Sequence, residues 1–127
     1  MISGIHHVAI ICSNYQRSRA FYTEQLNLEV IAENYQPDRG SWKLDLRLPD
    51  HRQIELFYIP GAPVRPSYPE AQGLRHLAFV TESVRAAKQE LAEKGVDTEE
   101  IRQDPYTGKR FMFFSDPDGL PIELYEA

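Results

Sequence analysis

Short apolar stretches rich in β-branched residues alternate along the chain with two patterns of helical spacing. A strand pattern over residues 5–12 is followed by Ser13 and Asn14, which are typical helix N-caps, and by apolar and aromatic residues at helical spacing over 15–26. Three further strand patterns follow, at 29–35, 42–48 and 53–59. The first half of the chain is therefore predicted to fold as β-α-β-β-β.

The second half repeats this order. A strand pattern at 74–80 precedes Ser83, a candidate N-cap, and the helical pattern after it runs to Lys94, where Gly95 is typical of a helix end. Three strand patterns complete this half, at 98–102, 110–115 and 121–125. The second half is also predicted to be β-α-β-β-β.

A proline-rich segment separates the halves. Four prolines occur in the ten residues 60–69, and proline has no backbone N–H for a helix interior or an inner strand. We therefore expect one domain made of two modules. The first covers about residues 1–60 and the second about 73–127, with a linker at about 60–72.

The two halves also share sequence at a nearly constant offset. The pattern Pro-Asp-x-x-x-Ile-Glu-Leu at 49–56 recurs 68 residues later at 117–124, and residues 5–11 resemble 74–80 at an offset of 69. Two such matches in corresponding strands indicate an internal duplication of an α+β module. Of the neighbours His6 and His7, which strand alternation places on opposite sheet faces, only His7 has an equivalent histidine.

The duplication selects four residues with metal-binding side chains. Each half supplies a histidine from its first strand, His7 or His76, and a glutamate from its last strand, Glu55 or Glu123. Each glutamate lies between two apolar residues and so faces away from the core. A single histidine or glutamate in a strand is most often structural or solvated. Four in matched pairs favour a divalent cation, because grouped carboxylates need a partner.

Composition and charge narrow the possible partners. A net charge of −5 and a pI near 5.3, with scattered basic residues, argue against nucleic acid. The apolar runs are too short to cross a bilayer, and the first residues do not resemble a secretory signal. The single cysteine, Cys12, lies in an apolar strand and fits a small buried residue in a reducing, cytoplasmic setting.

The repeated motifs resemble those of the vicinal oxygen chelate superfamily over nearly the whole chain. Within it, the chain is most similar to glyoxalase I (lactoylglutathione lyase) and its small bacterial relatives. The matching segments are 7–10, 17–22, 54–56, 75–79 and 116–124. The resemblance implies paired βαβββ modules that form curved half-barrel sheets around one metal ion. It also implies a particular ligand set: His7, Glu55, His76 and Glu123.

The resemblance further implies a reaction. The ion, which could be Zn, Ni, Co, Mn or Fe, would stabilise an enediolate formed from a small oxo compound or a thiol adduct. Glu55 and Glu123 would carry the proton, and the sequence does not assign base and acid between them. Other reactions of the superfamily stay open, namely acyl-CoA epimerisation, thiol transfer and dioxygenation. A non-catalytic small-molecule-binding protein is a further alternative.

Three expectations concern the surroundings of this site. The open sheets of two such modules leave uncovered edges, which favours a homodimer, with the ligands coming from one chain or from two. The loop 104–110 carries an aromatic residue and two cations, and is either an anion-binding segment or a solvated hairpin tip. Trp42 is either a pocket wall or part of the core.

Overall fold

The structure, a computed structural model, describes all residues 1–127 and divides into two compact units. The first unit is Met1–Val64 and the second is Arg65–Ala127, so the boundary falls within the proline-rich segment. No helix in the chain combines the length and the apolar character that crossing a membrane requires.

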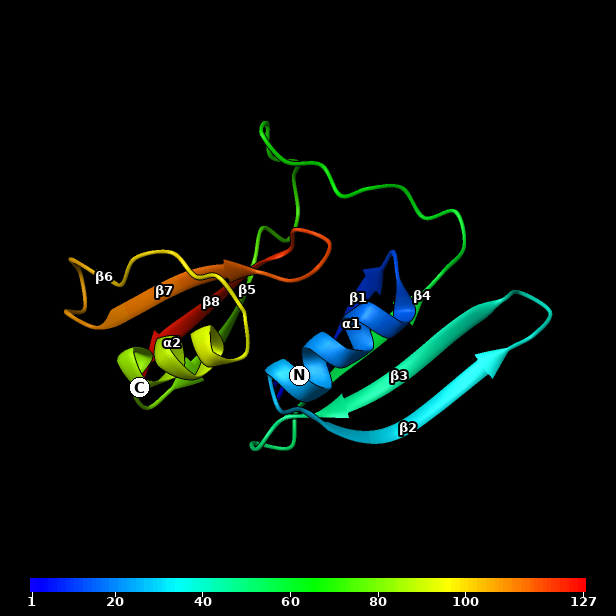
Figure 1. Cartoon of the computed structure of the whole chain (residues 1–127), viewed down its shortest axis with the longest axis horizontal. Helices are drawn as coiled ribbons and strands as arrows, with labels where there is room; N and C mark the ends of the chain where they lie inside the picture. Colours follow the sequence, from blue (N-terminus) through cyan, green and yellow to red (C-terminus); the bar gives the residue numbers. More distant parts are fainter. The chain divides into compact units, whose positions relative to one another are not determined.

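The first unit is one four-stranded mixed sheet with a helical segment (Figure 1). Its elements are β1 (His7–Cys12), α1 (Tyr15–Ala20), η1 (Phe21–Gln25), β2 (Glu29–Gln36), β3 (Ser41–Arg47) and β4 (Gln53–Tyr58). The strand order is β1-β4-β3-β2, in which β1 runs parallel to β4 and the other neighbours are antiparallel.

The second unit has the same topology. Its elements are β5 (Leu77–Thr81), α2 (Val84–Glu93), β6 (Arg102–Gln103), β7 (Arg110–Ser115) and β8 (Pro121–Glu126). The order β5-β8-β7-β6, with β5 parallel to β8, repeats that of the first unit strand for strand. The predicted α+β fold class and the β-α-β-β-β order of both halves are confirmed.

Two elements depart from the sequence prediction. The helix expected over 15–26 changes after Ala20 into the π-helical η1, where the hydroxyl of Thr23 donates to the carbonyl of Arg19 at 2.7 Å. Such a bond competes with the regular ladder of a helix. The strand expected over 98–102 is reduced to β6 and an isolated bridge, because a segment with one apolar residue in five lacks a face to bury.

The duplication extends to the helix starts. Asn14 accepts a hydrogen bond from the backbone N–H of Arg17 at 3.0 Å, and Ser83 accepts one from Ala86 at 3.1 Å. These N-caps are 69 residues apart, which is the offset of the matched first strands. At the end of α2, Gly95 adopts a φ of +78°, the left-handed conformation that stops a helix with little strain.

Each unit has its core on one face of its sheet. In the first unit, Leu44, Leu46, Ile54 and Leu56 are buried together with Tyr22 from the helical segment. In the second, the buried residues include Met112, Phe114, Ile122, Val84 and Leu91, where α2 contacts β7 and β8. Strand alternation therefore leaves the opposite face of each sheet for His7 and Glu55 in one unit and for Glu123 in the other.

Candidate metal centre

His7 and Glu55 lie side by side on the open face of the first unit. Glu55 on β4 is directly opposite Ala9 on β1, two residues along from His7, so the two side chains are diagonal neighbours. The His7 Nε2 atom is 3.5 Å from the Glu55 Oε2 atom. The glutamate side chain is only 15% exposed, against 40% for the histidine, so a largely buried carboxylate faces an accessible imidazole.

His76 and Glu123 form the same pair in the second unit. Glu123 is opposite Ala78, two residues along from His76, and the His76 Nε2 atom is 3.3 Å from the Glu123 Oε2 atom. The exposed fractions of the side chains, 36% and 14%, are almost those of the first pair. Both units thus build one imidazole–carboxylate pair with the same register, separation and burial.

The surroundings of the first pair are charged. The Lys43 Nζ atom is 3.9 Å from the Glu55 Oε1 atom and 2.9 Å from the Asp45 Oδ1 atom, and Asp45 lies directly opposite Glu55 in the sheet. The hydrogen bond to Asp45 raises the pKa of the Lys43 ammonium, and the charges of both carboxylates add to this effect against partial desolvation. A cation is therefore held beside the Glu55 carboxylate.

The surroundings of the second pair are aromatic. Phe113 lies opposite Glu123, at the position that Asp45 takes in the first unit. The rings of His76 and Phe113 pack edge to face, with a centroid distance of 5.0 Å and an interplanar angle of 85°. Farther along the same face, Phe111 stacks on Tyr125 with their centroids 6.3 Å apart. The duplicated pairs share geometry but not environment.

Strand alternation predicts that His6 points to the sheet face opposite that of His7. The structure does not place it there. Its Nδ1 atom is 2.9 Å from the Nδ1 atom of His7, and the two ring centroids are 5.2 Å apart. The expectation is wrong because β1 begins at His7, so the regular alternation does not reach its neighbour. His51, by contrast, is exposed in the β3–β4 turn, with a φ of +71°.

The structure brings the four predicted ligands together as two pairs. Neither unit contains a group of three or more histidine, cysteine, aspartate or glutamate side chains that could hold a metal ion by itself. The donor chemistry of the pairs nevertheless fits a divalent transition metal, because two imidazole nitrogens and two largely buried carboxylates are donors that such ions prefer. Each unit supplies two candidate donors.

The comparison with known proteins accounts for this duplicated architecture. Residues 4–124 match the family model of the Glyoxalase/Bleomycin resistance protein/Dioxygenase superfamily. The chain belongs to this superfamily. This match confirms that the sequence motifs are those of the superfamily, and it confirms the predicted fold.

Several relatives of this glyoxalase-superfamily chain match it almost end to end. It is 58% identical to the uncharacterized protein YwkD of Bacillus subtilis, covering 99% of this chain and 98% of the relative. It is 51% identical in sequence to the glyoxalase family protein from Enterococcus faecalis, whose crystal structure matches it with a TM-score of 0.90 and 97% of each chain covered.

More distant relatives carry names of enzymes. A 2-epi-5-epi-valiolone epimerase from Actinomyces sp is 31% identical, covering 95% of this chain and 78% of the epimerase. A lactoylglutathione lyase of Salmonella typhimurium is 27% identical, and the match covers 95% of this chain and 90% of the lyase.

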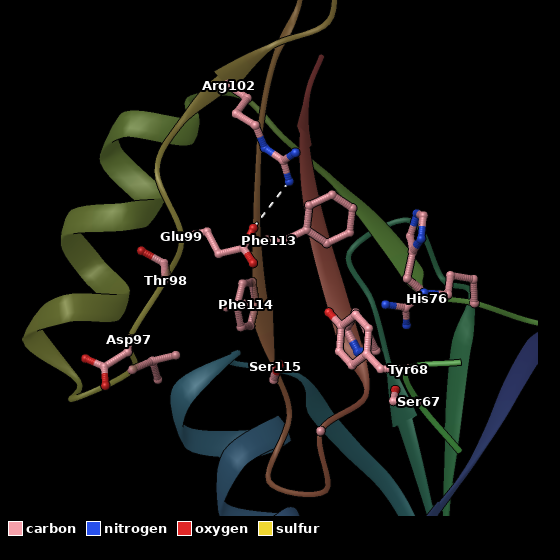
Figure 2. A pocket seen from close by; sticks show the side chains of 14 residues that line it. Ser67, Tyr68, His76, Asp97, Thr98, Glu99, Arg102, Phe113, Phe114 and Ser115 are labelled. Atoms are coloured by element: carbon pink, nitrogen blue, oxygen red, sulfur yellow. Dashed lines mark hydrogen bonds and ion pairs between the residues drawn. The ribbon is translucent and has the colours of Figure 1, made fainter. Parts of the chain in front are cut away.

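A pocket of about 720 Å³ opens beside His76 in the second unit of this superfamily member (Figure 2). Its lining includes Phe113, Arg102 from β6 and Tyr68 from the proline-rich segment. No motif or repeat in the sequence points to these three residues together. The duplication could have pointed to Phe113, because a residue equivalent to Asp45 and opposite a candidate ligand is placed by the repeat register.

The loop 104–110 is tied to the sheet through Tyr125. The Tyr125 hydroxyl donates to the Asp104 carboxylate at 2.9 Å and is also hydrogen-bonded to Thr107. The backbone N–H of Tyr106 and the Tyr125 hydroxyl together lower the pKa of Asp104. Tyr106 itself is 94% exposed, so its ring belongs to a solvated tip.

Trp42 lies on the core side of its sheet. Its ring stacks on Tyr15 of α1 with the centroids 4.6 Å apart, and Tyr35 contacts it from β2 at 4.8 Å. This half-buried tryptophan is thus part of an aromatic cluster on the helix side of the sheet.

Proposed function

We propose that the protein is a cytoplasmic, divalent-metal-dependent lyase or isomerase of glyoxalase type that acts on a small oxo compound or a thiol adduct. The metal ligands in this proposal are His7, Glu55, His76 and Glu123. The observation that carries it is the equivalence of the two imidazole–carboxylate pairs, with separations of 3.5 and 3.3 Å and glutamate exposures of 15% and 14%.

The contrast with neighbouring positions strengthens this argument. Lys43 and Asp45 flank the first pair, whereas Phe111 and Phe113 occupy the equivalent places beside the second. The duplicated fold thus tolerates charged or aromatic residues on this face. The pairs themselves are the same in both units, which supports a shared chemical task over a requirement of packing.

The chemistry divides between the ion and the carboxylates. A bound divalent ion would polarise neighbouring substrate oxygens and so acidify the adjacent carbon. Glu55 and Glu123 would then remove a proton from that carbon and return one to its neighbour. Two carboxylates in different environments suit a division between base and acid, and here one lies beside Lys43 and the other beside Phe113.

A second candidate is epimerisation, in which the proton returns to the same carbon. The epimerase relative, at 31% identity, supports epimerisation as a candidate. The lactoylglutathione lyase relative supports the glyoxalase-type reaction. Both reactions need the same pairs of residues. Substrates of both classes therefore belong in one activity panel, with methylglyoxal offered together with glutathione and other thiols.

The test is metal content measured after purification without chelators. His7→Ala, His76→Ala, Glu55→Gln and Glu123→Gln should each lose most of the bound metal, because each removes one of four donors. His51→Asn is the matched control, since it removes an exposed histidine and asparagine tolerates a positive φ. His6 contacts His7 and is unsuitable as that control. Equal metal content in all five variants would refute the proposed metal site. The remaining interpretation would then be a non-catalytic small-molecule-binding protein.

We propose further that the protein is a homodimer, which light scattering at micromolar concentration tests directly. Mixing subunits of His7→Ala and His76→Ala then shows how the pairs combine. If each site takes one pair from each copy, random mixing restores about a quarter of the sites, because every mixed dimer has one intact site. If each site lies within one chain, mixing restores none.

A further inference from the structure

The open face of the second unit carries a cation above two aromatic rings. The Arg102 Cζ atom is 5.1 Å from the centroid of Phe111 and 5.4 Å from that of Phe113. Both distances fall within the range of a cation–π interaction. We call Arg102, Phe111, Phe113 and Tyr125 the aromatic-cation face. None of these residues is used as a ligand or proton carrier in the proposed function.

The register of the sheet produces this face. Arg102 on β6 lies directly opposite Phe111 on β7, and Phe111 lies opposite Tyr125 on β8. Strand alternation places Phe113 on the same side as Phe111, while Met112 between them is buried in the core. The guanidinium is therefore fixed over rings that belong to the same face as Glu123.

The aromatic-cation face continues to the candidate ligand His76. Arg102, Phe113 and His76 all line the pocket of about 720 Å³. Figure 2 shows the Phe113 ring between the guanidinium and the imidazole. A small molecule whose reacting end lies at His76 would thus extend along Phe113 toward Arg102.

Arg102 has donors available for such a molecule. Its one charged partner is Glu99, with the Arg102 Nη2 atom 3.3 Å from the Glu99 Oε2 atom. The two side chains are 53% and 64% exposed, and ion pairs of that exposure are weak. A guanidinium has five N–H donors in a planar fork that matches a carboxylate. An incoming anion could take the place of Glu99 at little cost.

The local charge also favours an anion. The β6–β7 hairpin carries three cations, and strand alternation places Arg110 on the same side as the buried Met112, so Arg102 is the strand cation that lies on the face of the rings. The carboxylate of Asp104 in the connecting loop accepts hydrogen bonds from Tyr125 and from the backbone of Tyr106. The guanidinium of Arg102 is therefore the positive charge that an anion would meet on this face.

We propose that the aromatic-cation face selects the substrate as an organic carboxylate with an apolar or aromatic body. The body lies along the Phe113 side of the pocket, and the carboxylate binds the guanidinium of Arg102. This deepens the proposed function, on which it rests for the identity of the molecule as a substrate. Binding at the face does not itself require a metal.

Phenylacetate and its uncharged amide, phenylacetamide, are suitable probes. Titrations of the full-length, isotope-labelled protein by NMR should show that Arg102→Gln weakens phenylacetate binding about tenfold, the effect of losing a hydrogen bond to a charged group. The same variant should leave phenylacetamide binding unchanged. Glu99→Gln should strengthen phenylacetate binding, because it removes the competing carboxylate. Phe113→Leu should weaken both probes.

Arg85→Gln is the matched control. Arg85 is an exposed residue of α2, and its replacement changes the net charge of the protein by the same amount. Equal phenylacetate affinity in the Arg102 and Arg85 variants would overturn the proposal, as would equal losses for phenylacetate and phenylacetamide in Arg102→Gln.

Metal content measured on the same samples separates this proposal from the proposed function. A wild-type protein that binds no metal but retains the Arg102-dependent preference for phenylacetate would refute the metal site and support the aromatic-cation face. A metal-containing, active protein without that preference would refute the aromatic-cation face alone.

Discussion

Lys43→Gln should tighten binding of the proposed metal ion, because the wild-type ammonium would compete with that ion for Glu55. The Lys43 Nζ atom lies 3.9 Å from the Glu55 Oε1 atom, and the lysine side chain is 40% exposed. Two unit charges at that separation attract by about 1 kcal/mol in water. A metal ion must overcome this attraction, so its removal should lower the dissociation constant about fivefold. Glutamine is chosen because its amide still donates a hydrogen bond to Asp45.

The assay is competition with a chromogenic chelator at fixed pH and low salt. Lys94→Gln is the control, because this lysine pairs with Glu90 at 4.0 Å on α2 and its loss changes the net charge equally. Raising the ionic strength should reduce the gain, since the lysine is partly exposed. In a Glu55→Gln background the gain should vanish, which a double-mutant cycle measures. Unchanged or weaker metal binding in Lys43→Gln would refute the competition between Lys43 and the ion.

Two further predictions concern stability. Leu56→Ala should lower the free energy of unfolding by about 2–5 kcal/mol, because Leu56 is 0% exposed. Urea denaturation followed by circular dichroism measures this change, and a loss below about 1 kcal/mol would contradict the assigned core. Because the pKa of Asp104 is lowered in the folded protein, its ionised carboxylate should stabilise the loop 104–110 at pH above the ordinary aspartate pKa of 3.8. The ordered loop conformation should be lost as the pH falls through the folded-state pKa. The Gly108 amide signal in NMR reports this loss, and Asp104→Asn should remove its pH dependence.

The sequence predicted the fold because the same physical signals occur twice. The two halves share candidate helix N-caps, an Ile-Glu-Leu strand and a nearly constant offset, and these signals place Glu55 and Glu123 at equivalent points. The structure adds that the first N-cap is Asn14, equivalent to Ser83. The pairing of His7 with Glu55 follows from the diagonal register of parallel β1 and β4, which the order of elements does not determine.

The contacts at the edges of elements could not be predicted. Alternation assigns His6 to the opposite face, but its ring contacts His7 because the strand has not yet begun there. Arg102 belongs to a two-residue strand with no apolar pattern, so its position over Phe111 depends on cross-strand pairing alone. Tyr68 lies in the proline-rich segment, where spacing carries no information about pocket walls.

The division of the candidate ligands between two units has a consequence for cooperativity. Units with separate cores can in principle unfold at different denaturant concentrations. Each unit carries one imidazole–carboxylate pair, so a bound metal would stabilise the folded form of whichever unit supplies its donors. The effect of added metal on each denaturation transition would therefore show which of the two modules holds the ion.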